Sequence, residues 1–111
     1  MLPIWERGRA SSVRVIARKI LRDFWVKPTY ADAEQPLKAW FKLAEEADWA
    51  KPSEVKQALG SSSIVGDNRV VFNIAGNKYR LVAKINYPYR VLYIRFIGTH
   101  RQYDFIEVTE I

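Results

Sequence analysis

The chain of 111 residues contains no cysteine, which excludes disulfide bonds, thiolate metal sites and cysteine nucleophiles. It also lacks any run near the roughly 20 apolar residues that cross a bilayer, and its first residues lack the apolar stretch of a secretory signal. We therefore expect a cytoplasmic protein with no membrane partner. A chain of this length is expected to form one domain.

Carboxylates are missing from a long stretch of the C-terminal half. No Asp or Glu lies between Asp67 and Asp104, although the chain as a whole has 12 acidic and 18 basic side chains and a net charge of +6. The stretch contains seven basic residues, namely Arg69, Lys78, Arg80, Lys84, Arg90, Arg95 and Arg101. Clustering of one sign favours a polyanionic partner, although on charge alone a solvated surface fits equally well.

The N-terminal half has helical periodicity. Residues 1–12 show no period and are expected to be a flexible extension, and residues 13–16 can form a short edge strand. Apolar side chains at helical spacing predict a helix from Ala17 to about Trp25 and a second helix after Asp32 and Gln35, which resemble a capping box. A third helix should begin near Pro52 and end at Gly60. The tryptophans on these apolar stripes are expected to pack in the core.

After residue 60 the apolar residues alternate with a period of two. Three strands are predicted, with apolar sets Val70, Phe72 and Ile74, then Tyr79, Leu81, Ala83 and Ile85, then Leu92, Ile94 and Phe96. Turn signals at Gly76-Asn77 and around Pro88 make both connections short, which favours an antiparallel meander. Helices followed by strands indicate an α+β fold, with a short N-terminal strand and two to three helices on one face of a three- to four-stranded antiparallel sheet.

Strand alternation separates the charges from the apolar side chains. If the apolar set faces the helices, the other sheet face carries Asn73, Lys78, Arg80, Lys84, Tyr93 and Arg95. Cations next to an aromatic side chain can hold phosphates and stack a base, which is how single-stranded nucleic acid is usually bound. An ordinary solvated sheet face would carry both signs, so the pattern favours RNA binding.

Three strings of the sequence resemble a known family: IARKILRDFW at residues 16–25, DNRVVFNIAGNKYRLVAKINY at 67–87 and YIRFIGTHRQYD at 93–104. In this order they closely resemble the HigB toxins of bacterial type II toxin–antitoxin systems, from residue 13 onward. The resemblance implies a RelE-like α+β domain over residues 13–111 and cleavage of messenger RNA on the ribosome. It also implies a HigA-like antitoxin with a helix-turn-helix domain as the partner.

RNA can be cleaved without a metal when its own 2′-hydroxyl attacks the adjacent phosphate. The enzyme must then move protons and stabilise the extra charge on phosphorus. The cationic stretch offers no carboxylate for magnesium and the chain has a single histidine, so we expect neither a metal nor another cofactor. His100 is the preferred acid or base, because imidazole exchanges protons near neutral pH.

The other catalytic and RNA-binding candidates lie between Arg69 and Tyr103. With the resemblance, the catalytic candidates are His100, Arg95, Arg80, Lys78 and Tyr103, with the two arginines as phosphate ligands because guanidinium can contact two oxygens at once. The RNA-binding candidates are Arg69, Asn73, Asn77, Lys84, Tyr93, Thr99 and Arg101. Asn77 is equally well explained as a turn residue, and Tyr103 as a lid on the core.

Two other functions fit the same surface. A non-catalytic RNA-binding module would use the same cationic face without cleavage, and a protein-interaction module would use it for an acidic partner. The chain shows no helix pair with base-reading character, so binding to an operator is expected from the antitoxin.

Overall fold

The computed structural model describes residues 14–111. The expected extension at residues 1–12 lies outside this range. Among the described residues, no helix is both long and apolar enough to cross a membrane.

Four helical segments precede most of the sheet: α2 (Arg18–Trp25), the 3₁₀ segment η1 (Pro28–Ala33), α3 (Glu34–Glu46) and α4 (Pro52–Ala58). The three predicted helices are therefore confirmed, and α4 begins at its proline, where the first turn has no intrahelical donor to lose. The predicted capping box before α3 is wrong, because α3 has no side-chain cap. Asp32 instead belongs to η1 and accepts hydrogen bonds from Lys78 and Tyr79.

The sheet contains five strands in the order β1-β5-β4-β3-β2. The strands are β1 (Arg14–Ile16), β2 (Ser63–Val65), β3 (Arg69–Ile74), β4 (Tyr79–Asn86) and β5 (Val91–Thr99). The antiparallel meander of β3, β4 and β5 is confirmed, and the short N-terminal strand β1 pairs in parallel with β5. The edge strand β2, antiparallel to β3, is an addition to the predicted sheet.

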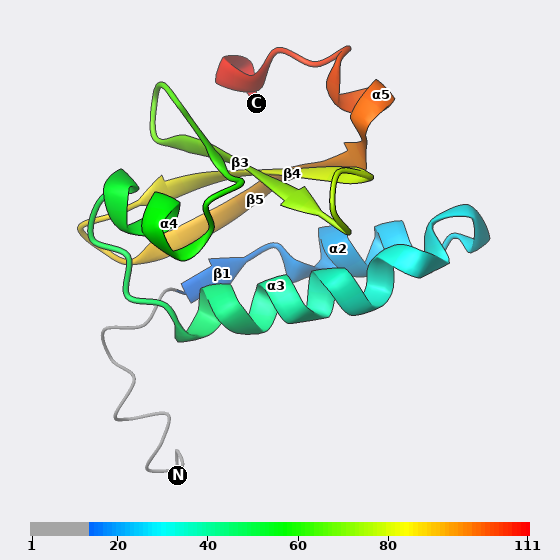
Figure 1. Ribbon diagram of the computed structural model, residues 1–111, viewed down its shortest axis with the longest axis horizontal. Coiled ribbons are helices and arrows are strands. Elements are labelled where there is room, and N and C mark those ends of the chain that lie inside the picture. Colours follow the sequence, from blue (N-terminus) through cyan, green and yellow to red (C-terminus); the bar gives the residue numbers. More distant parts are fainter. Residues whose placement is uncertain (1–13) are drawn as a thin grey trace, which may run out of the picture.

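Helices α2 and α3 cover one face of the sheet (Figure 1), and the core lies between them. Phe72 and Leu81 come from the sheet side and Trp40 from α3, with the Trp40 and Phe72 ring centroids 5.3 Å apart. The predicted apolar sets of β3 and β4 are all buried. Trp25, by contrast, is only partly buried and packs at the margin of the core.

One strand departs from strict alternation. Ile94 pairs with Ala83 and Phe96 pairs with Val82, so Arg95 is an extra residue in a β-bulge. After the bulge, Phe96 shares the face of Val82, and Ile97 takes the place beside the core. The prediction that Phe96 faces the helices is therefore wrong.

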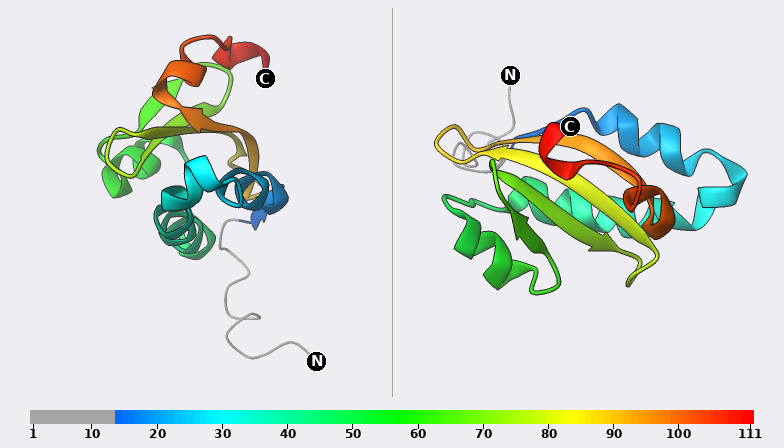
Figure 2. Two further views of the ribbon diagram at one scale, coloured as in Figure 1. Left: turned by 90° about the vertical axis from the view of Figure 1, so that its right-hand side faces the viewer. Right: turned by 90° about the horizontal axis from the view of Figure 1, so that it is seen from above.

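The second sheet face is partly covered by the end of the chain. Residues 104–111, including η2 (Val108–Glu110), pass over this face from the end of β5 (Figure 2). Val71 and Val82 pair on this face and are buried although the helices lie on the other side. The sequence prediction of a fully exposed cationic sheet face thus needs correction.

Candidate active site

Arg80 on β4 points away from α2 and α3, on the face that the C-terminal residues partly cover. Asn73 lies directly opposite Arg80 on β3, and its side-chain oxygen accepts a hydrogen bond of 2.7 Å from the guanidinium. The Asn73 amide nitrogen in turn donates to the carbonyl of Ser61 at 3.1 Å. These contacts fix the Asn73 amide and orient the arginine across the sheet.

The Tyr103 ring lies beside the same guanidinium, with 5.6 Å between the Arg80 Cζ atom and the ring centroid. Tyr103 ends α5 (His100–Tyr103), a single helical turn that directly follows β5. The arginine and the aromatic ring therefore meet at the end of the sheet, where a cation held over a ring face is stabilised electrostatically.

Two features hold α5 in this place. Thr99 and Gln102 form a reciprocal capping box, with Gln102 N donating to Thr99 Oγ1 at 3.1 Å and Thr99 N donating to Gln102 Oε1 at 2.8 Å. Gly98, directly opposite Arg80, is buried, and a Cβ atom there would lie 2.6 Å from the Phe96 ring and 2.7 Å from Gln102 Oε1. A larger residue at 98 would therefore displace the turn that carries His100 and Tyr103.

His100 is the first residue of α5 and is about half exposed. Its Nδ1 atom lies 3.4 Å from a carboxylate oxygen of Asp104, one turn further along. A carboxylate beside Nδ1 favours the orientation that leaves Nε2 free for proton transfer. Sequence reasoning proposed His100 but missed Asp104, although the i, i+4 spacing was visible.

The Arg80 guanidinium retains hydrogen-bonding capacity. Within the described part of the chain its buried Nε atom has no hydrogen-bond partner, and its one hydrogen bond goes from Nη1 to Asn73. An arginine with unused donors suits a phosphate, because guanidinium presents donors in a planar fork.

Lys84, Tyr93 and Arg95 gather at the other end of the same face. Lys84 pairs directly with Tyr93, and the bulge places Arg95 with them in the lining of one pocket beside the β4–β5 turn. Neither cation has an ion pair among residues 14–111. Lys84 lies four positions from Arg80 along β4, about 13 Å at the usual rise per residue. Arg95 was predicted to act beside Arg80, but it lies in this second group, which we call the flanking group.

Lys78 does not join either group. It lies in the turn between β3 and β4, where its ammonium pairs with Asp32 of η1 on the helical side. The hydrogen bonds from Lys78 and Tyr79 lower the pKa of Asp32, and the bond to Asp32 raises the pKa of Lys78. The prediction that Lys78 shares a face with Arg80 is wrong, because a partner 46 residues upstream draws it to the other side.

Arg69 is buried, with only 5% of its surface exposed. Its guanidinium donates to the main-chain oxygen of Ile111, with 2.9 Å from Nε, and to the Asp67 carboxylate at 2.7 Å. These bonds tie the last residues to β3. Although Arg69 was an RNA-binding candidate, its donors are used inside the protein and it is not accessible to a phosphate.

The remaining candidates have simpler settings. Asn77 is exposed in the β3–β4 turn, where the positive φ values belong to Ala75 and Gly76. Thr99 caps α5, and Arg101 is exposed on α5 without an ion pair to any described residue. Gln102 and Gly98 were missed, although the Thr99-x-x-Gln102 spacing is the known signature of a capping box. The described residues contain no group of three metal-ligating side chains.

Comparison with known proteins identifies the family to which the chain belongs. Residues 33–106 match the model of the HigB toxin family, described as the RelE-like toxic component of a toxin–antitoxin system. The mRNA interferase toxin HigB of Escherichia coli strain K12 is 30% identical over 95 residues, covering 84% of this chain and 89% of that protein. The mRNA interferase HigB proteins of Escherichia coli O157:H7 and Shigella flexneri match to the same extent. The chain therefore belongs to the HigB family of toxins.

Proposed function

We propose that this toxin is an endoribonuclease that cleaves messenger RNA while it is being translated on the ribosome. The observation that carries the proposal is the convergence of Arg80, Tyr103 and His100 at one end of the sheet, in a chain whose relatives are named mRNA interferases. An arginine, an aromatic hydroxyl and an imidazole provide charge stabilisation and proton transfer without a metal.

In the proposed reaction, the 2′-hydroxyl oxygen forms a bond to the adjacent phosphorus and the bond to the 5′-oxygen breaks. The 2′-hydroxyl loses its proton and the leaving 5′-oxygen gains one, so the products carry a cyclic phosphate and a 5′-hydroxyl. Arg80 stabilises the charge that develops on the phosphate oxygens. His100, oriented by Asp104, either accepts the proton of the 2′-hydroxyl or donates a proton to the 5′-oxygen, and Tyr103 serves as the other proton-transfer group or as a stacking surface for the base.

The flanking group extends the same surface. Lys84 and Arg95 are free to hold phosphates on one side of the cleaved bond, and Tyr93, which is partly exposed, can stack on a base. Because Lys84 lies about 13 Å from Arg80 along β4, the residues of the flanking group would contact neighbouring nucleotides. They therefore contribute to binding, whereas the Arg80 group contributes to the reaction.

The partners follow from this activity. We propose that the toxin acts in the cytoplasm on messenger RNA and ribosomes, and that a HigA-like antitoxin with a helix-turn-helix domain neutralises it. Binding of operator DNA is assigned to that antitoxin, since no described helix pair of the toxin has base-reading character.

A purified translation system tests the proposal. We expect messenger RNA to be cut when ribosomes translate it and to stay intact when the same RNA is incubated with the toxin alone. A complete absence of cleavage at every toxin concentration, with RNA binding retained, would support the non-catalytic RNA-binding alternative instead.

A further inference from the structure

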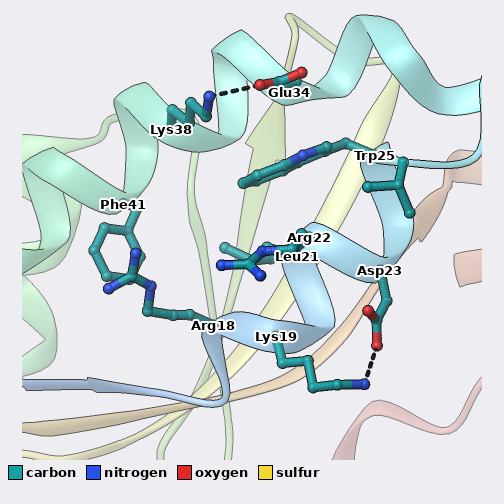
Figure 3. A pocket seen from close by; sticks show the side chains of 10 residues that line it. Arg18, Lys19, Leu21, Arg22, Asp23, Trp25, Glu34, Lys38 and Phe41 are labelled. Carbon is teal, nitrogen blue, oxygen red and sulfur yellow. Dashed lines mark hydrogen bonds and ion pairs between the residues drawn. The ribbon is translucent and has the colours of Figure 1, made fainter.

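A groove lies between α2 and α3 (Figure 3), the two helices on the sheet face opposite to that of Arg80. Its volume is about 650 Å³, which is room for several side chains of a partner. Leu21 forms its floor, and Trp25 and Phe41 form walls that are only partly buried. Val26, at one end, is 63% exposed. The groove is thus an apolar hollow on the surface, separate from the proposed cleavage site.

Cations surround this apolar hollow. The Arg18 guanidinium lies 4.9 Å from the centre of the Phe41 ring, and the Lys38 ammonium lies 5.6 Å from the centre of a Trp25 ring. The Arg22 side chain extends into the middle of the groove, between the two helices (Figure 3).

The two carboxylates of the groove are already paired. Asp23 binds Lys19 at 2.8 Å, and Glu34 binds Lys38 at 2.5 Å. Arg18 and Arg22 have no ion pair to any residue that the structure describes. The groove therefore presents two uncompensated positive charges beside apolar surface, and a complementary occupant needs carboxylates next to apolar side chains.

The apolar lining favours a protein segment over RNA. Nucleic acid would require exposed ring faces for stacking, but Arg18 and Lys38 already occupy a face of Phe41 and of Trp25. The Leu21 and Val26 side chains have no hydrogen-bond donor or charge for a phosphate. They suit contact with the apolar side of an amphipathic helix that lies along the groove.

We propose that the α2–α3 groove is the docking site of the antitoxin, through a segment that carries carboxylates and apolar side chains on one face. A toxin–antitoxin system supplies such a partner, and the inference rests on the family assignment and not on the identity of the catalytic groups. The carboxylates bind Arg18 and Arg22, and the apolar side chains cover Leu21 and Val26.

The test uses the full toxin and the product of the reading frame adjacent to its gene, and measures affinity by calorimetry. The variant Arg18→Glu with Arg22→Glu reverses both free charges. The matched control, Lys27→Glu with Lys42→Glu, reverses two exposed charges on the same segments outside the groove lining. We expect the groove variant to bind at least ~10-fold more weakly and the control to remain within about threefold.

The readouts separate this inference from the proposed function. The groove variant should still cleave messenger RNA like the parent, and should no longer be neutralised in cells by the co-expressed antitoxin. If the double variant does not fold, as judged by circular dichroism, Arg22→Gln replaces it and should show the same direction. Absence of messenger cleavage by the parent would overturn the proposed function and leave the affinity result standing.

Three results would overturn the docking proposal. The first is equal antitoxin affinity for the parent and the folded groove variant. The second is loss of RNA affinity in the groove variant with antitoxin binding intact, which would assign the groove to nucleic acid. The third is a self-associating parent that becomes monomeric only in the groove variant while antitoxin binding is unchanged, which would assign the groove to a second copy of the chain.

Discussion

Arg80 and Tyr103 meet at the end of the sheet, with the guanidinium 5.6 Å from the centre of the tyrosine ring, although they lie on different elements 23 positions apart. Asn73 holds the arginine from the neighbouring strand, and the capped turn α5 holds the tyrosine and His100. The proposed chemistry therefore depends on how accurately α5 is positioned against β4.

Replacing Gly98 with alanine should disturb that position. The added Cβ would lie 2.6 Å from the Phe96 ring and 2.7 Å from Gln102 Oε1, and overpacking of this kind costs about 1–3 kcal/mol. We expect a lower free energy of unfolding and slower messenger cleavage. Gly66→Ala is the matched control, because a Cβ there meets no atom within 4 Å, and it should change neither quantity.

Removing the cap of α5 should slow cleavage with little loss of fold. Thr99→Ala deletes the hydroxyl that accepts from Gln102 N, at a cost of about 1 kcal/mol. Because Thr99 positions His100 and does not itself react, kcat should fall more than RNA affinity. Thr99→Ser keeps the hydroxyl and should restore the rate, whereas equal rates for the alanine and serine variants would contradict this role.

Arg69 should matter for stability and not for RNA binding. Arg69→Ala leaves the Ile111 oxygen without its buried donor, and we expect a loss of about 2 kcal/mol in the free energy of unfolding by urea denaturation. Lys84 pairs with Arg69 in the sheet but has no ion pair to a described residue, so Lys84→Ala should change stability by less than about 0.5 kcal/mol. RNA affinity should show the reverse order, with a larger loss for Lys84→Ala than for Arg69→Ala.

The pair of Asp32 and Lys78 should make stability depend on pH at the acid end. The hydrogen bonds from Lys78 and Tyr79 lower the pKa of Asp32 below its ordinary value of 3.8, so its contribution is present above that value and is lost as the pH falls through the lowered pKa. Asp32→Asn should therefore be less stable than the parent at pH 6, and the difference should shrink toward pH 2. A constant difference over that range would argue against the pair.

Much of the fold could be predicted because its signals are local. The helical periodicity, the turn residues and the alternation of β3 and β4 depend on neighbours along the chain, and the three helices and the buried apolar sets of β3 and β4 are confirmed. The bulge at Arg95 could not be predicted, because a single extra residue changes pairing without leaving a distinctive residue type. It moved Phe96 to the other face and placed Arg95 with Lys84.

The candidate site was harder to predict because some of the cations in this stretch form ion pairs with carboxylates elsewhere in the fold and others do not. The stretch from residue 68 to 103 has no carboxylate, yet Lys78, Arg69 and Arg90 are paired by Asp32, Asp67 and Asp48. The pairs with Asp32 and Asp48 are long-range contacts that depend on the packing of η1 and of the segment after α3, whereas Asp67 lies only two residues from Arg69. Among the described residues, Arg80, Lys84 and Arg95 remain as the unpaired cations on the sheet face away from the helices.

Mapping of the RNA ends produced during translation tests the central proposal most directly. The parent toxin should leave cyclic-phosphate and 5′-hydroxyl ends, and His100→Ala and Arg80→Ala should each lower the cleavage rate by about 100-fold or more while remaining folded. Unchanged cleavage in both folded variants, or 5′-phosphate ends from the parent, would contradict the account.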